Sequence, residues 1–159
     1  MGIRETFLRQ TGDLLICKLN SRMETLKEEL IAVKARRLDA WTEGDLSENS
    51  AYHEAEKTEE GIHAEMAAIS KRESELDDFL GLDYRHSGFI SIGSVVTLMY
   101  ENGRERTIMI VPDQFSELEL GWIATGSPIG VELESKQAGD TVTVIMPKKT
   151  PIYKVLEVD

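Results

Sequence analysis

The feature that most constrains the fold is a series of mainly apolar residues whose spacing alternates between four and three positions. Its members are Leu19, Met23, Leu26, Leu30, Val33, Arg37 and Ala40, with Arg37 as the one charged member. This spacing is the heptad repeat of a helix that packs along one side against a partner helix. No proline occurs before Pro112, so no residue of that kind interrupts a helix in this region.

A second stripe follows at heptad-compatible spacings, and Glu73 is its polar interruption. It comprises Ala55, Ile62, Met66, Ile69, Leu76 and Leu80. Gly44 lies between the stripes and is expected to end the first helix. Two amphipathic helices joined by so short a loop must pack antiparallel, stripe against stripe. Each helix is expected to have about 29 residues and a length of roughly 43 Å, which suits a probe or a spacer.

The pattern changes after a linker rich in glycine and serine between Gly81 and Gly93. Strands are expected at 95–100, 104–111, 121–124, 141–146 and 152–158, and Asn102-Gly103 predicts a hairpin turn. Ser127-Pro128 predicts the start of a short helix that ends near Lys136. The expected fold is therefore α+β. A helical hairpin at 1–82 precedes an antiparallel sheet with one helix at 83–159.

Composition narrows the possible functions. The formal net charge of -11 argues against indiscriminate binding to a phosphate backbone. Cys17 is the only cysteine, so an intrachain disulfide and a cysteine-based zinc site are excluded, and it is expected to be buried. No apolar run is long enough for a signal peptide or a membrane span, so the cytoplasm is the expected location.

Asp45 and Glu48 lie three residues apart at the expected start of the second helix. This spacing is typical of a capping box, and Asp45 or Ser47 could cap that helix. Two carboxylates at the end of a long probe could instead share a Mg²⁺ ion, which takes few protein oxygens. They would form an incomplete hydrolytic site, and a partner would have to supply the rest.

Two segments carry motifs of a known family. Residues 44–49 have the sequence G-D-L-S-E-N, and Tyr52 follows three positions later. Residues 127–130 have the sequence S-P-I-G, and G-D-T-V-T-V follows at 139–144. Both motifs, in this order, resemble those of the Gre family of bacterial transcript-cleavage factors. The resemblance covers about residues 11–159 and implies an FKBP-like fold for the C-terminal domain.

The resemblance also implies a mechanism. The hairpin would enter the secondary channel of bacterial RNA polymerase, and the C-terminal domain would dock near the channel rim. Asp45 and Glu48 would assist the polymerase's catalytic Mg²⁺, as metal ligands only in that complex, while the polymerase cleaves the 3′ end of backtracked RNA. The chain would be a monomer without a cofactor of its own, and it would stimulate an enzyme without being one.

Further residues follow from the same resemblance. The candidates for contact with the displaced RNA are Lys34, Arg36, Arg37 and Lys57. A solvated helix face is the alternative interpretation for these four. The candidates for docking on the polymerase are Asp113, Glu117, Ser127 and Pro128. Trp41 and Glu43 depart from the family, which more often has smaller or basic residues at these positions.

Two other functions stay open. A non-cleaving Gre-like regulator would occupy the channel and inhibit the polymerase. A prolyl isomerase or a coiled-coil adaptor would belong to another class. An isomerase needs an aromatic-lined pocket, whereas the aromatic residues of the second half are scattered, and Trp122 is expected in the core.

Overall fold

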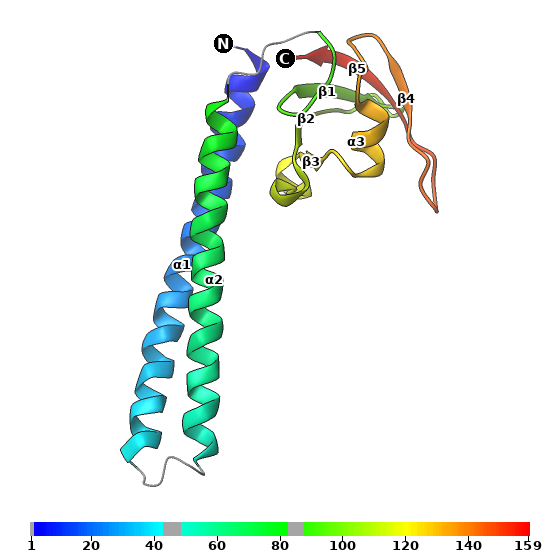
Figure 1. The fold of residues 1–159 in the computed structure, drawn as a ribbon. Helices are drawn as coiled ribbons and strands as arrows, with labels where there is room; N and C mark the ends of the chain where they lie inside the picture. The colour runs from blue at the N-terminus through cyan, green and yellow to red at the C-terminus, as the bar shows by residue number, and fades with distance from the viewer. Residues whose placement is uncertain (1, 43–48, 83–87) are drawn as a thin grey trace. The chain divides into compact units, whose positions relative to one another are not determined.

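A computed structural model describes residues 2–42, 49–82 and 88–159 (Figure 1). The chain divides into two compact units. The helical unit is Leu14–Gly81, and the sheet unit combines Met1–Asp13 with Leu82–Asp159. The first thirteen residues therefore belong to the same compact unit as the sheet, although the sequence pattern had grouped them with the helices.

The helical unit is an antiparallel hairpin of two long helices that lie side by side (Figure 1). Helix α1 spans Ile3–Thr42 and has 40 residues, so it is longer than the sequence pattern predicted. Helix α2 spans Ser50–Gly81. Each helix contains a series of buried residues at intervals of seven positions: Leu19, Leu26, Val33 and Ala40 on α1, and Ala55, Ile62, Ile69 and Leu76 on α2. The expected heptad stripes and the helical hairpin are confirmed.

Two details of the stripes differ from the prediction. Cys17 is exposed, because the helical period turns it away from the side on which Leu15 and Leu19 are buried. At the end of α2 the buried residue is Phe79, three positions after Leu76, while Leu80 is only half-buried. Residues three and four positions after Leu76 both lie on the same helical face as Leu76. The larger aromatic side chain of Phe79 takes the buried position here.

A bidentate ion pair also joins the two helices. The Arg22 Nε and Nη2 groups donate to the two carboxylate oxygens of Glu65 at 2.8 and 3.0 Å. The Arg22 Nη1 group donates to Glu29 at 3.2 Å. The hydrogen bond to Arg22 lowers the pKa of the Glu65 carboxyl from its ordinary value. These side chains are exposed, so the pair orients the helices more than it stabilises them.

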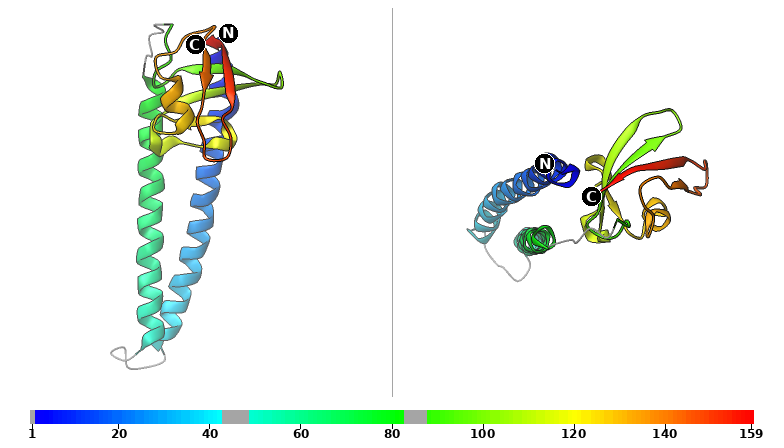
Figure 2. Two further views of the ribbon diagram at one scale, coloured as in Figure 1. Left: turned by 90° about the vertical axis from the view of Figure 1, so that its right-hand side faces the viewer. Right: turned by 90° about the horizontal axis from the view of Figure 1, so that it is seen from above.

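The sheet unit contains a five-stranded sheet with the strand order β3-β2-β1-β5-β4 (Figure 2). The strands are β1 at Val95–Tyr100, β2 at Glu105–Val111, β3 at Trp122–Ala124, β4 at Thr141–Thr143 and β5 at Ile152–Val158. The turn between β1 and β2 uses Gly103 at φ 77°, a left-handed conformation that glycine adopts without strain. The predicted Asn102-Gly103 hairpin is confirmed.

Both faces of the central strands carry buried residues. Ile108 and Ile110 belong to one core cluster, together with Leu133 of helix α3 (Pro128–Leu133). Met109 and Val111 are buried on the opposite face of β2.

The first turns of α1 contact the segment that leads into β3. The Trp122 Nε1 group donates a 2.9 Å hydrogen bond to the Thr11 hydroxyl. A Cβ on Gly121 would lie 3.5 Å from the Phe7 ring. Trp122 is fully buried, which confirms the prediction that it belongs to the core.

The sheet unit departs from the predicted pattern in three places. Strand β3 pairs with β2 in parallel, because two 3₁₀ turns, at Asp113–Phe115 and Leu118–Leu120, carry the chain back across the sheet. Helix α3 ends at Leu133, shortly before Ser135 adopts φ 64°. Strand β4 ends at Thr143 because Pro147 and Pro151 lack the N–H groups that a regular ladder needs. The α+β class is confirmed.

Candidate functional site at the end of the helical hairpin

The last turn of α1 and the first turn of α2 are joined directly by Asn49. Its Nδ2 group donates to the Ala40 carbonyl oxygen at 2.6 Å, and its Oδ1 accepts from the Tyr52 N–H at 3.1 Å. The first bond satisfies a carbonyl near the end of α1, and the second caps the start of α2. One side chain therefore holds together the two ends of the tip segment, residues 43–48.

Asp45 and Glu48, the predicted metal-assisting pair, lie in the tip segment, outside the described residues. The competing prediction gives the carboxylate of Asp45 or the hydroxyl of Ser47 the role of a cap for the second helix. Helix α2 begins at Ser50, and its capping oxygen belongs to Asn49. Asn49 therefore caps α2, whereas Asp45 and Ser47, the predicted caps, lie outside the described residues. The motif supplies its own cap at its last residue, one position after the carboxylate of Glu48.

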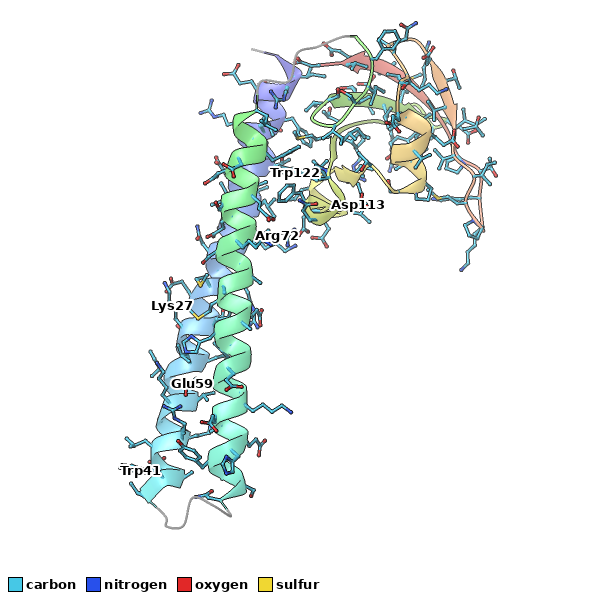
Figure 3. The ribbon with its side chains drawn as sticks, viewed as in Figure 1. Lys27, Trp41, Glu59, Arg72, Asp113 and Trp122 are labelled. Carbon is cyan, nitrogen blue, oxygen red and sulfur yellow. The ribbon has the colours of Figure 1, made fainter. Side chains whose placement is uncertain are left out.

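Of the four basic candidates, Lys34 and Arg37 converge on one acidic side chain of the other helix. The Arg37 Nη1 lies 2.7 Å from the Glu59 Oε2, and the Lys34 Nζ lies 3.9 Å from the Glu59 Oε1. The Glu59 side chain is only 12% exposed, so its charge is compensated mainly by these two cations. Figure 3 labels Glu59 on α2, facing the neighbouring helix.

The other two basic candidates lie elsewhere on the hairpin. Arg36 lines a pocket of about 300 Å³ that also contains the acidic residues Asp39 and Glu54. Lys57 is exposed on α2 and lines neither this pocket nor the one described next. The structure therefore brings together Lys34 and Arg37 but leaves Arg36 and Lys57 apart from them.

A second pocket, of about 350 Å³, brings aromatic residues next to these cations. It is lined by Lys34, Arg37, Leu38, Trp41 and Tyr52. Trp41 projects from the last turn of α1 and is 57% exposed (Figure 3). The sequence marked Trp41 only as a departure from the family. The signal that could have found this cluster is its helical spacing, since Leu38 and Trp41 follow Lys34 by four and seven positions.

In the sheet unit, three of the predicted docking residues surround the turn between β3 and α3. The Asp113 Oδ1 accepts from the Gly126 N–H at 3.0 Å and from the Thr125 hydroxyl at 3.3 Å. The Ser127 hydroxyl donates to the Ala124 carbonyl at 2.7 Å, and its oxygen accepts from the Gly130 N–H at 3.1 Å. Pro128 is the first residue of α3, so the predicted Ser127 cap is confirmed.

Close packing explains why glycine ends the S-P-I-G motif. A Cβ on Gly130 would clash with the carbonyl oxygens of Ala124 and Thr125, so any larger residue would push α3 away from β3. The fourth docking candidate, Glu117, pairs through its backbone with Trp122, with N–H to carbonyl distances of 2.9 and 3.0 Å. These local bonds fix the conformation of the docking candidates, and their role in docking stays a prediction.

Within 2–42, 49–82 and 88–159, the His, Cys, Asp and Glu side chains form no group of three or more that could hold a metal ion. No helix in the described part of the chain is both long and apolar enough to cross a membrane.

Comparison with known proteins identifies the family. Residues 85–159 match the family model described as "Transcription elongation factor, GreA/GreB, C-term". The chain is 34% identical to transcription elongation factor GreA of Thermosipho melanesiensis over 141 residues, which are 87% of this chain and 88% of that protein. It is 31% identical to GreA of Syntrophomonas wolfei over 146 residues, which are 89% of this chain and 90% of that protein.

Among solved structures, the chain is similar to the GreA factor homolog 1 (Gfh1) protein of Thermus thermophilus. The sequence identity is 21% and the TM-score is 0.41, over 89% of this chain and 92% of that chain. The identification depends on the curated relatives, which exceed 30% identity over most of both chains. On this similarity, together with the two motifs in their order, the chain belongs to the GreA/GreB family of transcription elongation factors.

Proposed function

We propose that this protein binds bacterial RNA polymerase, inserts its helical hairpin into the secondary channel and stimulates cleavage of backtracked RNA by the polymerase. The observation that carries the proposal is the acidic pair Asp45 and Glu48 between two helix ends that Asn49 fastens together, in a chain of the GreA/GreB family. The cleavage would rescue elongation complexes that have arrested.

The reach of the hairpin supports this proposal. Helix α2 has 32 residues, which at 1.5 Å per residue is roughly 48 Å. The buried residues of the described hairpin form a single stripe on each helix, so the hairpin is only two helices thick. A thin rod of this length suits delivery of a few side chains to the end of a channel.

The chemistry of the acidic pair fits this role. Carboxylate oxygens are the protein ligands that Mg²⁺ prefers. A Mg²⁺ ion held in the polymerase would supply activation of the attacking water. In this proposal Asp45 and Glu48 add negative charge and hydrogen-bond acceptors beside that ion, while Asn49 links the ends of the two helices that flank them. The chain contributes part of a site that belongs to its partner.

The remaining candidate residues have supporting roles in the proposal. Lys34 and Arg37 face the displaced RNA together, and Arg36 and Lys57 contact it from other sides of the hairpin. Asp113, Glu117, Ser127 and Pro128 form or shape the surface that docks on the polymerase. The turn held by Asp113 and Ser127 is suited to docking, because its hydrogen bonds fix its conformation before binding.

The proposal is tested by RNA cleavage in a stalled, backtracked elongation complex with Mg²⁺. The wild-type protein is expected to shorten the transcript from its 3′ end. Asp45→Asn and Glu48→Gln preserve side-chain shape and remove charge, and each is expected to lower the stimulated rate on the order of 100-fold. Binding to the polymerase is measured in parallel and is expected to stay unchanged.

A matched control is Glu54→Gln, which removes an exposed carboxylate of α2 outside the tip segment. This variant should stimulate cleavage like the wild type. If the wild-type protein binds the polymerase and no cleavage follows, the protein is a channel-occupying regulator and cleavage stimulation is excluded. If neither tip variant changes the rate, the acidic pair has no part in the reaction.

A further inference from the structure

Large apolar side chains are exposed near the joined end of the hairpin. Trp41 is 57% exposed and Leu38 is 59% exposed, and both line the 350 Å³ pocket with Tyr52. Exposed tryptophan is uncommon on a surface rich in charge, and an aromatic cluster of this kind usually has a binding partner. Neither side chain belongs to the hairpin core, which consists of the heptad residues. Packing of the hairpin therefore does not explain them.

The pocket is large enough to hold one planar group. Its volume lies at the lower end of the ~300–1,000 Å³ that small-molecule sites occupy. Two helices build it, since Trp41 comes from the last turn of α1 and Tyr52 from the first turn of α2. The Tyr52 N–H donates to the capping oxygen of Asn49. The backbone of the first turn of α2, which carries Tyr52, is therefore held by the same side chain that bonds to α1.

The charge beside the pocket is positive, although the chain carries a net charge of -11. Arg37 is paired with Glu59 at 2.7 Å, whereas Lys34 lies 3.9 Å from that carboxylate and its side chain is 52% exposed. An ammonium group has three N–H donors, so Lys34 can bind a further anion. Among the described residues of this cluster, the two cations Lys34 and Arg37 face the one carboxylate of Glu59, which leaves a surplus of one positive charge at the rim of the pocket.

Aromatic faces next to a cation are what single-stranded nucleic acid requires, because each base offers a flat face and each nucleotide carries a phosphate. We propose that this pocket binds one unstacked base of single-stranded RNA, with Trp41 stacking on the base and Lys34 pairing with a neighbouring phosphate. The inference rests on the proposed function, in which the displaced 3′ segment of backtracked RNA is the single strand that the hairpin meets.

The test uses a backtracked elongation complex whose displaced RNA 3′ segment contains 2-aminopurine, with Ca²⁺ in place of Mg²⁺ so that the RNA stays intact. Stacking on tryptophan quenches the fluorescence of this base. The wild-type protein is expected to quench it. Trp41→Ala is expected to raise the protein concentration needed for half-maximal quenching by about 5- to 150-fold, the usual range for loss of one base–aromatic stack.

Two further variants make the test specific. Trp41→Phe retains an aromatic face and should retain most of the quenching. Ile31→Ala removes an apolar side chain that is 71% exposed on α1 but lies outside the pocket, and it should behave like the wild type. Circular dichroism of each variant checks that the helices are intact, which is expected because Trp41 is outside the hairpin core.

Two further measurements separate the stacking proposal from the cleavage proposal. One is RNA cleavage with Mg²⁺, and the other is binding of the protein to an elongation complex without backtracked RNA. Loss of quenching in Trp41→Ala with unchanged binding to that complex supports the stacking site. Quenching by Trp41→Ala equal to that by the wild type overturns the site and leaves the cleavage proposal standing. The stacking site is also overturned if Trp41→Ala binds more weakly to the complex without backtracked RNA, because Trp41 then contacts the polymerase. If the wild-type protein quenches without cleaving, cleavage stimulation fails and the stacking site is upheld.

Discussion

The sheet unit and the helical hairpin differ in how many of their residues are removed from solvent. The sheet unit buries Trp122 and Phe115 at 0% and 2% exposure and has core residues on both faces of its central strands. The hairpin buries a single stripe of residues on each helix and adds partly buried Met23, Leu30 and Met66. A sheet covered on both faces fixes most of its side chains, whereas a two-helix seam leaves most of each helix in water.

Because of this difference, the residues that contribute most to stability and the residues proposed to bind RNA lie in different parts of the chain. Buried apolar area dominates folding energy, so the sheet unit has little freedom to vary its interior. Near the tip of the hairpin, the side chains of Lys34, Leu38 and Trp41 can change without removing a core contact. The hairpin is therefore the part in which binding residues can be exchanged at small cost to the fold.

The largest expected effect comes from Trp122→Ala. The change removes a fully buried indole and its hydrogen bond to Thr11, and it is expected to lower the free energy of unfolding by about 3–5 kcal/mol. Denaturant unfolding followed by circular dichroism measures the loss. A loss below about 1 kcal/mol would contradict the central place of Trp122 in the core.

The comparable change in the hairpin is Leu26→Ala, also at a fully buried residue. It is expected to cost about 2 kcal/mol, at the low end for such a substitution, because the two helices can close around a small side chain. An equal or greater cost than that of Trp122→Ala would mean that the hairpin is as tightly packed as the sheet unit, which would remove the contrast between the two regions.

Substitution of Asn49 is expected to lower stability less than the two core substitutions do, but to lower stimulated RNA cleavage more. Asn49→Ala removes both the cap of α2 and the bond to Ala40, at about 1 kcal/mol. Asn49→Asp retains the capping oxygen and loses only the donor to Ala40. Both variants should lower stimulated RNA cleavage while polymerase binding is retained. Normal cleavage by Asn49→Asp would show that the link to Ala40 is not needed to position the tip segment.

The smallest effect is expected from Glu65→Gln, which removes the charge partner of Arg22. A carboxyl whose folded pKa is lowered adds stability above its unfolded pKa, and this stability is lost as the pH falls through the folded pKa. The wild type should therefore be slightly more stable than the variant near neutral pH. The difference should vanish well below the ordinary pKa of 4.5. Thermal unfolding at both pH values measures it, and a difference that grows in acid would contradict the assignment.

Local patterns were sufficient to predict most elements. Heptad spacing predicted the helical hairpin, because the face that a helix buries must be apolar. Asn102-Gly103 predicted the turn between β1 and β2, because the backbone at Gly103 needs a positive φ. The parallel pairing of β3 with β2 was not predictable in this way. It depends on how the two 3₁₀ turns return the chain across the sheet, and no periodicity encodes that path.

The sequence alone determined the α+β class, the heptad faces, the Ser127 cap and the motifs that identify the family, since each depends on residues close together in the chain. Tertiary structure decided that the Asn49 side chain, which caps α2, also bonds to the Ala40 carbonyl on the other helix. It also decided that Lys34 and Arg37 share Glu59 and meet Trp41 and Tyr52 at one pocket. Contacts between two helices depend on their register, and register is fixed only when both stripes pack.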